Sequence, residues 1–303
     1  MAMDLLCMGE PLVELNQQDD GRYLSGIGGD TSNCAIAAAR QGATVGYLCR
    51  LGDDLFARQI KHCWQQEGVD SSPVIDCREG VTGLYFVSHD QQGHHFSYRR
   101  QGSSASLIQP GDLPRDLLST VRVLHLSGIT LGISPSAADA GFEAIDIARQ
   151  SGATVSFDPN YRPALWPLRR ARAVIHEAMS LCQVALPGLD DARLLTGLDD
   201  ADRIADFYLQ LGMEVVALTL GADGVLVATQ HQRERLPAHS VTPVDATGAG
   251  DTFDGCFLAQ WLHHHDPIDA ARYGNAAAAL STQGYGAVTP IPRREQVQAL
   301  LSA

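Results

Sequence analysis

The sequence predicts an α/β fold in which a doubly wound, mostly parallel sheet carries helices on both faces. Short apolar segments typical of strands alternate with helix-like segments, for example at 121–129, 134–150 and 153–157, and this order favours parallel strands joined by crossover helices. A predicted hairpin at 81–100 interrupts the alternation and indicates a small additional β-sheet. No internal repeat or proline-rich linker divides the chain, so we expect one domain over residues 1–303.

Composition narrows the classes of function. The net charge of −13 argues against a nucleic acid or an anionic membrane as partner, so an anionic substrate would have to be held by local arginines. The seven cysteines are odd in number and widely spaced, with no Cys-x-x-Cys pair, which predicts reduced thiols in the cytoplasm. The opening residues lack the basic region of a signal peptide, and no segment is apolar for long enough to span a membrane.

The first predicted strand leads to a glycine-rich helix start. A buried strand is expected at 5–15, running into Gly9-Glu10-Pro11, where the proline should end regular pairing. Gly-Ile-Gly-Gly-Asp-Thr-Ser-Asn at 26–33 then opens an alanine-rich helix. The side chain that caps this helix is expected to be Asp30, Thr31 or Ser32. A dinucleotide-binding fingerprint would need a third glycine at position 31, where Thr31 stands, and the chain has no Walker A sequence.

The hairpin at 81–100, with its turn at 90–93, ends in two adjacent arginines. Two strands alone are marginally stable, so this hairpin needs a partner surface. Arg99 and Arg100 must point to opposite faces of the strand, and Arg100 shares the face of Tyr98. A guanidinium turned inward could hold a carboxylate by two parallel hydrogen bonds. The alternative is a solvated basic patch at the end of a strand.

The segment 243–257 contains the strongest chemical signal. Gly248 and Gly250 precede an amphipathic helix, whose first turn exposes unpaired N–H groups at the positive end of the helix dipole. These donors favour an anion such as a phosphate. Asp251 would repel that anion unless it had another task, such as taking a proton from an attacking hydroxyl. The alternative is an aspartate that only caps the helix.

Three other segments bear on ligand binding. Asp-Pro-Asn-Tyr-Arg at 158–162 follows a predicted strand, at the sheet edge where open α/β sheets place ligands. The segment 219–224 predicts a glycine-containing turn after another strand, at a position that could contact a ligand. The alternative is a plain hairpin turn with no role in ligand binding. The three histidines at 263–265 point in different directions along a helix and cannot converge on one metal ion.

Together these segments resemble a known family. Asp-x-x-Gly-Ala-Gly-Asp-x-Phe at 245–253, the Gly-Gly turn followed by Asn33, and Asp-x-Asn-x-Arg at 158–162 are similar to signatures of the ribokinase-like (pfkB) carbohydrate kinases. The resemblance covers nearly the whole chain. It implies a ribokinase-like fold with a β lid formed roughly by 12–28 and 80–101, and an ATP-dependent sugar kinase activity.

The substrate implied by the resemblance is a sugar acid. Gly-Glu-Pro-Leu-Val near the start, Tyr-x-Arg in the lid and Leu-Trp at 165–166 are most similar to the branch that phosphorylates the 6-hydroxyl of 2-keto-3-deoxygluconate. Fructokinases share Asp-x-Asn-x-Arg, so a neutral sugar such as fructose, or a nucleoside, is the alternative. A different class would be a sugar- or nucleotide-binding regulator without turnover. The intact Asp251 and its two glycines argue against that class.

The resemblance also implies roles for individual residues. The expected catalytic groups are the base Asp251 and an anion hole from the backbone of Gly248, Ala249 and Gly250. The expected sugar contacts are Gly28, Gly29, Asn33, Tyr85, Tyr98, Arg100, Arg162 and Asp251, with Glu14 as a looser match. The expected nucleotide contacts are Thr219, Gly221, Gly224, Gly248, Gly250 and Asn275.

The implied cofactors are ATP and Mg²⁺, and the requirement for a monovalent cation stays open. Asp191 would place Mg²⁺ through water, although Gly188 stands where the family usually has asparagine and Asp191 is shorter than the usual glutamate. Helix capping is the alternative role for Asp191. The resemblance further implies a homodimer formed through the β lid.

Overall fold

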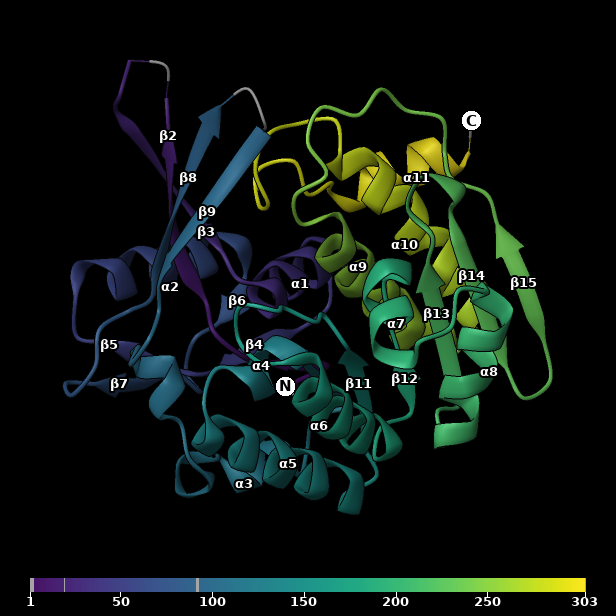
Figure 1. The fold of residues 1–303 in the computed structure, drawn as a ribbon, viewed down its shortest axis with the longest axis horizontal. Coiled ribbons are helices and arrows are strands. Elements are labelled where there is room, and N and C mark those ends of the chain that lie inside the picture. The colour runs from purple at the N-terminus through teal and green to yellow at the C-terminus, as the bar shows by residue number, and fades with distance from the viewer. Residues whose placement is uncertain (1–2, 19, 91–92, 303) are drawn as a thin grey trace.

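The computed structural model describes residues 3–18, 20–90 and 93–302, and a nine-stranded sheet forms its centre (Figure 1). Seven neighbouring strands are parallel, and two antiparallel strands complete one edge. In spatial order the strands are β15 (Arg233–Leu236), β14 (Val225–Thr229), β13 (Val215–Thr219), β12 (Val184–Ala185), β11 (Thr154–Asp158), β10 (Val123–Ser127), β1 (Leu5–Met8), β4 (Val45–Leu48) and β6 (Val69–Asp70). The predicted mostly parallel sheet is therefore confirmed.

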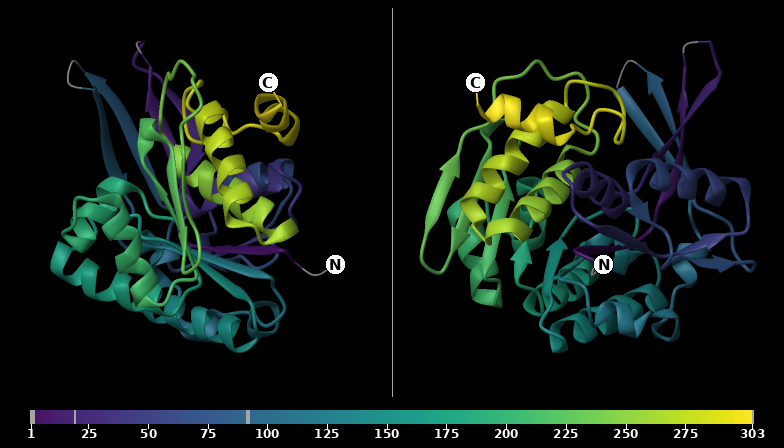
Figure 2. Two further views of the ribbon diagram at one scale, coloured as in Figure 1. Left: turned by 90° about the vertical axis from the view of Figure 1, so that its right-hand side faces the viewer. Right: turned by 180° about the vertical axis from the view of Figure 1, so that it is seen from behind.

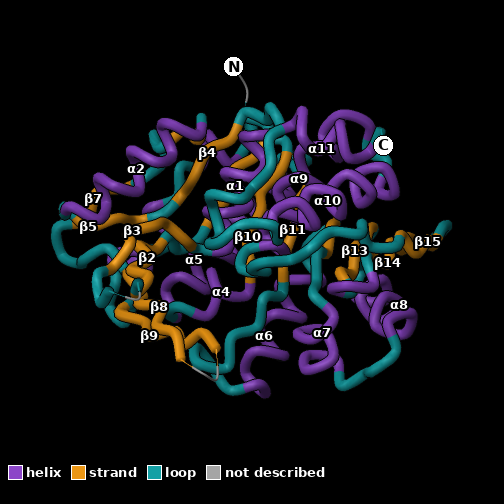
Figure 3. The backbone as a smooth tube through the Cα atoms, turned by 90° about the horizontal axis from the view of Figure 1, so that it is seen from above, coloured by secondary structure: helices purple, strands orange, loops and turns teal. Residues whose placement is uncertain are grey.

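Helices cover both faces of this sheet, as Figures 2 and 3 show. One face carries α1 (Asp30–Arg40), α2 (Leu55–Glu67), α9 (Ala249–His264), α10 (Pro267–Ser281) and α11 (Arg294–Leu301). The other carries α3 (Arg115–Leu118), α4 (Gly128–Gly132), α5 (Pro135–Gln150), α6 (Leu168–Ser180), α7 (Leu189–Thr196) and α8 (Ala201–Leu211). Short 3₁₀ helices lie at Ser104–Leu107, Pro110–Asp112 and Gly221–Asp223.

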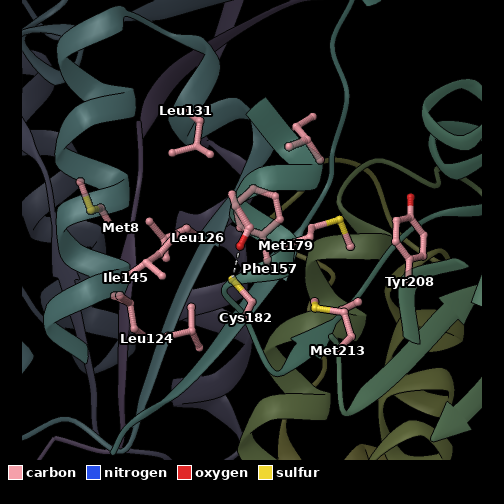
Figure 4. Packing of buried hydrophobic residues seen from close by; sticks show 14 of the residues in the cluster. Met8, Leu124, Leu126, Leu131, Ile145, Phe157, Met179, Cys182, Tyr208 and Met213 are labelled. Carbon is pink, nitrogen blue, oxygen red and sulfur yellow. Dashed lines mark hydrogen bonds between the residues drawn. The ribbon is translucent and has the colours of Figure 1, made fainter. Parts of the chain in front are cut away.

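Each face has its own apolar core. On the α5–α6 side, Phe157 of β11 packs among Leu126, Ile145 and Met179 (Figure 4). Their burial holds the strand ends, and with them the loops that follow the strands, in fixed positions. Within the described residues, no helix combines the length and apolar character needed to cross a bilayer.

The second sheet is the expected β lid. It contains four strands in the order β3 (Tyr23–Gly28), β2 (Leu12–Gln17), β8 (Leu84–Asp90) and β9 (Gly93–Arg99). The antiparallel pairing of β8 with β9 confirms the hairpin, and the strands before it supply the partner surface. Gln91 and Gln92 of its predicted turn lie outside the described residues. A third, two-stranded sheet pairs β5 (Arg50–Gly52) with β7 (Ile75–Cys77).

Several element predictions need correction. The segment 5–15 is two strands in two sheets, β1 and β2. Regular pairing ends before Pro11, which has no N–H, as predicted, but the chain then continues as a strand of a second sheet. Residues after Ser127 form the short helix α4 instead of extending the strand at 121–129. The N-cap of α1 is Gly29, which makes no side-chain cap, so Asp30, Thr31 and Ser32 do not cap this helix.

The helix predicted to start at Gly248 to Asp251 is present as α9, but it is buried on most sides and is not amphipathic. It packs between α1 and α10, and both neighbours require apolar or small side chains from it. Consequently α9 is held tightly, and its first turn has a fixed position in the molecule. The histidines at 263–265 close its last turn, as predicted.

Candidate active site

A cleft of about 580 Å³ lies where the lid meets the carboxyl ends of the central strands. From the lid and the first strand it is lined by Glu10, Leu12, Tyr85, Phe96, Tyr98 and Arg100. From the strand ends and the helices it is lined by Gly29, Asp30, Asn33, Asp158, Asn160, Arg162, Gly188, Asp191, Thr219, Gly248, Gly250, Asp251 and Asp254. This is the sheet edge at which the sequence predicted ligand binding.

Gly248 and Gly250, at the start of α9, are glycines for different structural reasons. Gly248 is the N-cap with φ +74°, and a Cβ added there would lie 3.0 Å from the Cβ of Ala287. A Cβ on Gly250 would meet nothing within 4 Å, so the fold leaves that space open towards the cleft. Ala249 donates its N–H to the carbonyl of Ala246 at 3.2 Å and is not available to a ligand in this conformation. At a helix start, N–H groups such as that of Gly250 have no intrahelical acceptor.

Asp251 stands in the first turn of α9 and faces the cleft. The amide of Asn33, on α1, donates to its Oδ2 at 2.8 Å and fixes the carboxylate. Burial raises the pKa of Asp251 to about 7; the charge of Asp30 adds to this rise, and the bond from Asn33 opposes it. A carboxylate with a pKa near neutrality can take a proton and remain ionised at physiological pH, as a general base must.

Further carboxyl groups surround Asp251. Asp30 begins α1, Asp158 ends β11, and Asp254 follows Asp251 by one turn of α9. Burial raises the pKa values of Asp158 and Asp254, and their mutual repulsion with Asp251 and Asp30 adds to the rise. Neither Asp158 nor Asp254 was predicted as a site residue, although Asp158 begins the motif at 158–162 and Asp254 shares the helix face of Asp251.

Arg100 turns inward and Arg99 outward, as the strand geometry predicted. Inside, however, Arg100 is already paired: its Nε donates to Oε2 of Glu10 at 2.7 Å, and Ser103 donates to Oε1 of the same carboxylate at 2.5 Å. Its guanidinium carbon lies 5.6 Å from the ring centre of Tyr98. Glu10 is 1% exposed, and its burial raises its pKa despite the adjacent Arg100. This ion pair was not predicted from the sequence, in which its two residues lie 90 positions apart.

Arg162 is held more loosely. Its Nη1 donates to the carbonyl of Tyr161 at 3.1 Å and lies 3.5 Å from Oδ2 of Asp191, and its side chain is 49% exposed. Asp191 accepts the N–H of Tyr161 at 3.0 Å, and burial raises its pKa. Gly188 is the N-cap of α7 and no side chain caps it, so the capping role considered for Asp191 is not what the structure has.

The predicted sugar contacts are mostly brought together. Gly29, Asn33, Tyr85 and Tyr98 line the cleft, and the two tyrosine rings lie 5.5 Å apart. Gly28 lies behind Tyr85, because a Cβ there would be 2.4 Å from the tyrosine oxygen. That oxygen donates to Glu14 at 2.5 Å, and Glu14 does not line the cleft.

Only some of the predicted nucleotide contacts line the cleft. Thr219 lines the cleft, whereas Gly221, Gly224 and Asn275 do not. Gly224 has φ +96°, and a Cβ there would lie 2.0 Å from the carbonyl oxygen of Leu236. The amide of Asn275 donates to the carbonyl of Pro237 at 2.8 Å. These contacts with the chain itself explain the residue types, so roles towards a nucleotide stay predictions.

Asp191 lines the cleft and is the residue predicted to place Mg²⁺. Among the described residues, no three His, Cys, Asp or Glu side chains converge to hold a metal ion. Mg²⁺ keeps most of its waters and takes one or two carboxylates together with substrate phosphates. Asp191, which lines the cleft in the first turn of α7, fits one such water-mediated contact.

Comparison with known proteins shows the family of the chain. Residues 2–294 match the family described as pfkB family carbohydrate kinase. Two similar proteins named 2-dehydro-3-deoxygluconokinase are 33% identical (Bacillus subtilis, covering 100% of this chain and 97% of the relative) and 34% identical (Thermoproteus tenax, 99% and 95%). A fructokinase from Xylella fastidiosa, solved with bound ATP, superposes with a TM-score of 0.92 at 26% identity, covering 100% of this chain and 99% of that one.

Proposed function

This chain belongs to the pfkB family of carbohydrate kinases, and from that premise we propose that it phosphorylates the 6-hydroxyl of 2-keto-3-deoxygluconate with ATP. The observation that carries the proposal is the layout of one cleft: Asp251 lies beside a helix start that suits a phosphate, and arginines occur elsewhere in its lining. Such a layout fits a substrate with a hydroxyl at one end and a carboxylate at the other. The two relatives named 2-dehydro-3-deoxygluconokinase support the same substrate.

The proposed reaction is an in-line transfer. Asp251, oriented by Asn33, takes the proton of the 6-hydroxyl as its oxygen bonds to the γ-phosphorus of ATP. The bond from that phosphorus to the bridging oxygen breaks, and ADP leaves. The N–H groups at the start of α9, including that of Gly250, stabilise the charge on the transferred oxygens. Mg²⁺, held through water by Asp191, would neutralise further charge on the phosphates.

Substrate identity is tested directly by coupled detection of ADP. The panel comprises 2-keto-3-deoxygluconate, its C4 epimer, fructose, ribose and adenosine. We expect the highest kcat/KM for one of the two keto-deoxy acids. A higher value for a neutral sugar would reject the proposed substrate, and no ADP from any compound would reject the kinase activity.

Arg162 is the arginine best able to bind the sugar carboxylate, because Glu10 already neutralises Arg100. We expect Arg162→Leu to lower kcat/KM for the acid sugar roughly 10- to 100-fold, the usual value of a hydrogen bond to a charged group. At pH 8.5, where Asp251 stays ionised in both proteins, fructose, which has no carboxylate, should change by less than about threefold. Arg170→Leu, on the exposed face of α6, is the control and should affect neither substrate. Equal losses for both substrates would contradict the carboxylate role.

The pH dependence of the reaction follows from the ionisation of Asp251. Its pKa of about 7 results from burial and from Asp30, with Asp158 and Asp254 close by and Arg162 opposing the rise. Only the ionised form accepts a proton, so kcat/KM should fall about tenfold for each pH unit below 7 and level off above it. The profile should be measured with ATP far below its KM, so that it reports the unliganded enzyme. A flat profile between pH 5 and 8 would exclude Asp251 as the base.

A fructokinase is the second candidate, and one observation favours it. The Glu10–Arg100 ion pair cancels one of the two charges expected to attract a carboxylate. The fructokinase with bound ATP is also similar over the whole chain. The Arg162 and panel experiments separate the two substrates.

We further propose that the whole chain acts as one catalytic domain covered by its lid, in the cytoplasm and as a homodimer. The lid supports the dimer, because it exposes the large apolar side chains of Tyr23, Leu24 and Phe96. All seven cysteines are free, which suits a reducing compartment. Analytical ultracentrifugation of the protein and of a Leu24→Asp variant tests the dimer.

A further inference from the structure

One arginine outside the cleft binds a carboxylate and two backbone carbonyl groups. Arg40 is the last residue of α1, and its side chain is 8% exposed. Its Nε and Nη2 donate to the two carboxylate oxygens of Glu67, the last residue of α2, at 2.8 Å each. Its Nη1 donates to the carbonyl of Val288 at 3.1 Å and to that of Ile291. Arg40 thus joins the ends of two helices to the loop between α10 and α11.

The part of this loop at residues 286–292, which we call the strap, contacts the start of α9. Its Ala287 lines the cleft, and a Cβ added at Gly248, the N-cap of α9, would lie 3.0 Å from the Cβ of Ala287. The N–H of Gly286, where the strap begins, donates to Oδ2 of Asp245 at 2.9 Å. The position of the strap therefore determines how much space remains beside the helix start that is predicted to bind phosphate.

The far end of the strap is attached to α1 at a second residue. The amide of Gln41, directly after Arg40, donates to the carbonyl of Pro292 at 2.9 Å. Gln41 is 3% exposed, and its Oε1 accepts the hydroxyl of Tyr273 on α10 at 2.9 Å. Buried polar groups that are all hydrogen-bonded favour one arrangement, because any shift leaves donors or acceptors unpaired. The strap is thus held in place by the end of α1.

The same helix also holds the base. Asn33, about two helical turns before Arg40, donates to Asp251 at 2.8 Å. Helix α1 is therefore bonded to the base near its start and to the strap at its end. Reacting groups that are misplaced by about 1 Å can lose roughly 10²-fold in rate, even when the cause lies far from the chemistry. The end of α1 is thus a place where a substitution can disturb the nucleotide without contacting it.

We propose that Arg40 is a positioning residue that holds the strap against the start of α9 and so places the N–H groups that receive the phosphates of ATP. The inference rests on the proposed kinase function and adds a residue outside the cleft to it. The effect should concern ATP and not the sugar. Among the hydrogen bonds of the described residues, none joins the strap to Tyr85, Tyr98 or Arg162.

The test compares Arg40→Met with wild type by calorimetry, with ATP and Mg²⁺ and, separately, with 2-keto-3-deoxygluconate. We expect ATP to bind roughly 10-fold more weakly and kcat to fall by up to about 10²-fold. The dissociation constant of the sugar should change by less than about threefold, whereas a general loss of structure would weaken both ligands. Arg293 lies 3.6 Å from Glu67, so the variant does not leave this carboxylate without a cation and should fold, which a thermal melt verifies.

Arg122→Met is the matched control. Arg122 likewise pairs with a carboxylate, that of Asp4 at 2.9 Å, and donates to a carbonyl, that of Leu262 at 2.7 Å, but it does so at the last turns of α9. This variant should leave the binding of both ligands within about threefold of wild type. Equal weakening of ATP and sugar by Arg40→Met, or no weakening of ATP, would overturn the inference.

A second variant and a separate outcome keep the test decisive. If Arg40→Met does not fold, Arg40→Lys takes its place, because lysine keeps the charge but lacks the fork, and a loss of about 3- to 10-fold confined to ATP is expected. A wild-type protein that binds ATP but forms no ADP with any sugar would reject the proposed function instead. The comparison of ATP binding would then still decide the role of Arg40.

Discussion

Replacing Asp251 with asparagine is expected to lower kcat by roughly 10²–10⁴ while ATP and the sugar still bind. Asparagine keeps the size of the side chain, and its oxygen can still accept the bond from Asn33, so the geometry of the site is preserved. What is lost is the capacity to take the proton of the attacking hydroxyl. We expect kinetic assays to show the loss of turnover and calorimetry to show unchanged binding of ATP and of the sugar.

Asp254→Asn provides the comparison for this variant. Asp254 lies one turn further along α9, is 3% exposed and also lines the cleft, but no contact links it to Asn33 among the interactions of the described residues. We expect its loss of kcat to be less than about tenfold. If both variants lose activity equally, the reaction depends on the total charge of the cleft and not on one base.

Asp251→Asn should also stabilise the fold. The pKa of Asp251 is about 7 in the folded protein and 3.8 in an ordinary setting, so the folded state binds the proton more tightly than the unfolded one. The carboxylate therefore destabilises the protein increasingly as pH rises from 3.8 to about 7. At pH 8 the variant should melt at a higher temperature than wild type, and near pH 4 the difference should disappear.

The elements predicted best from the sequence are those that local pattern determines. Helix α5, expected at 134–150, spans Pro135–Gln150 after the N-cap Ser134. The Glu10–Arg100 pair could not be found in this way, because its partners lie 90 positions apart. Likewise, Asp30 and Asn160 are brought together only when α1 and the loop after β11 meet across the sheet. The lid prediction depended on family resemblance, since two strands alone do not indicate their partners.

The motif at 219–224 shows why the sequence alone does not locate the nucleotide-binding residues. Gly224 is required by the carbonyl of Leu236, which leaves no room for a Cβ, whether or not a phosphate binds nearby. Thr219, in contrast, faces the cleft. A glycine in a motif thus reports a backbone constraint, and only its surroundings tell whether the constraint comes from the chain or from a ligand.

Gly250 gives the second large effect. Gly250→Val is expected to lower kcat/KM for ATP roughly 10²–10³-fold, the usual cost of losing one donor at an anion hole. The reason is steric. A Cβ at this position would meet no other protein atom within 4 Å, so the valine side chain would extend into the cleft. There it would occupy the space of the phosphates and keep them away from the N–H groups of the first turn. The melting temperature should stay within a few degrees of wild type. Kinetics with varied ATP and a thermal melt provide both measurements.

Gly248→Val and Gly111→Val are the comparison variants for Gly250→Val. Gly248→Val would also reduce activity, but its φ of +74° and the contact with Ala287 would destabilise the fold by about 1–3 kcal/mol, so its effect does not report on the phosphates. Gly111, in the 3₁₀ helix at Pro110–Asp112 and outside the cleft, has open space like Gly250, and Gly111→Val should leave the kinetics unchanged. A stable Gly250→Val enzyme with normal ATP kinetics would mean that the start of α9 does not bind the transferred phosphoryl group. Asp251 would then have no phosphoryl group beside it, and its proposed role as the general base of a phosphoryl transfer would be rejected.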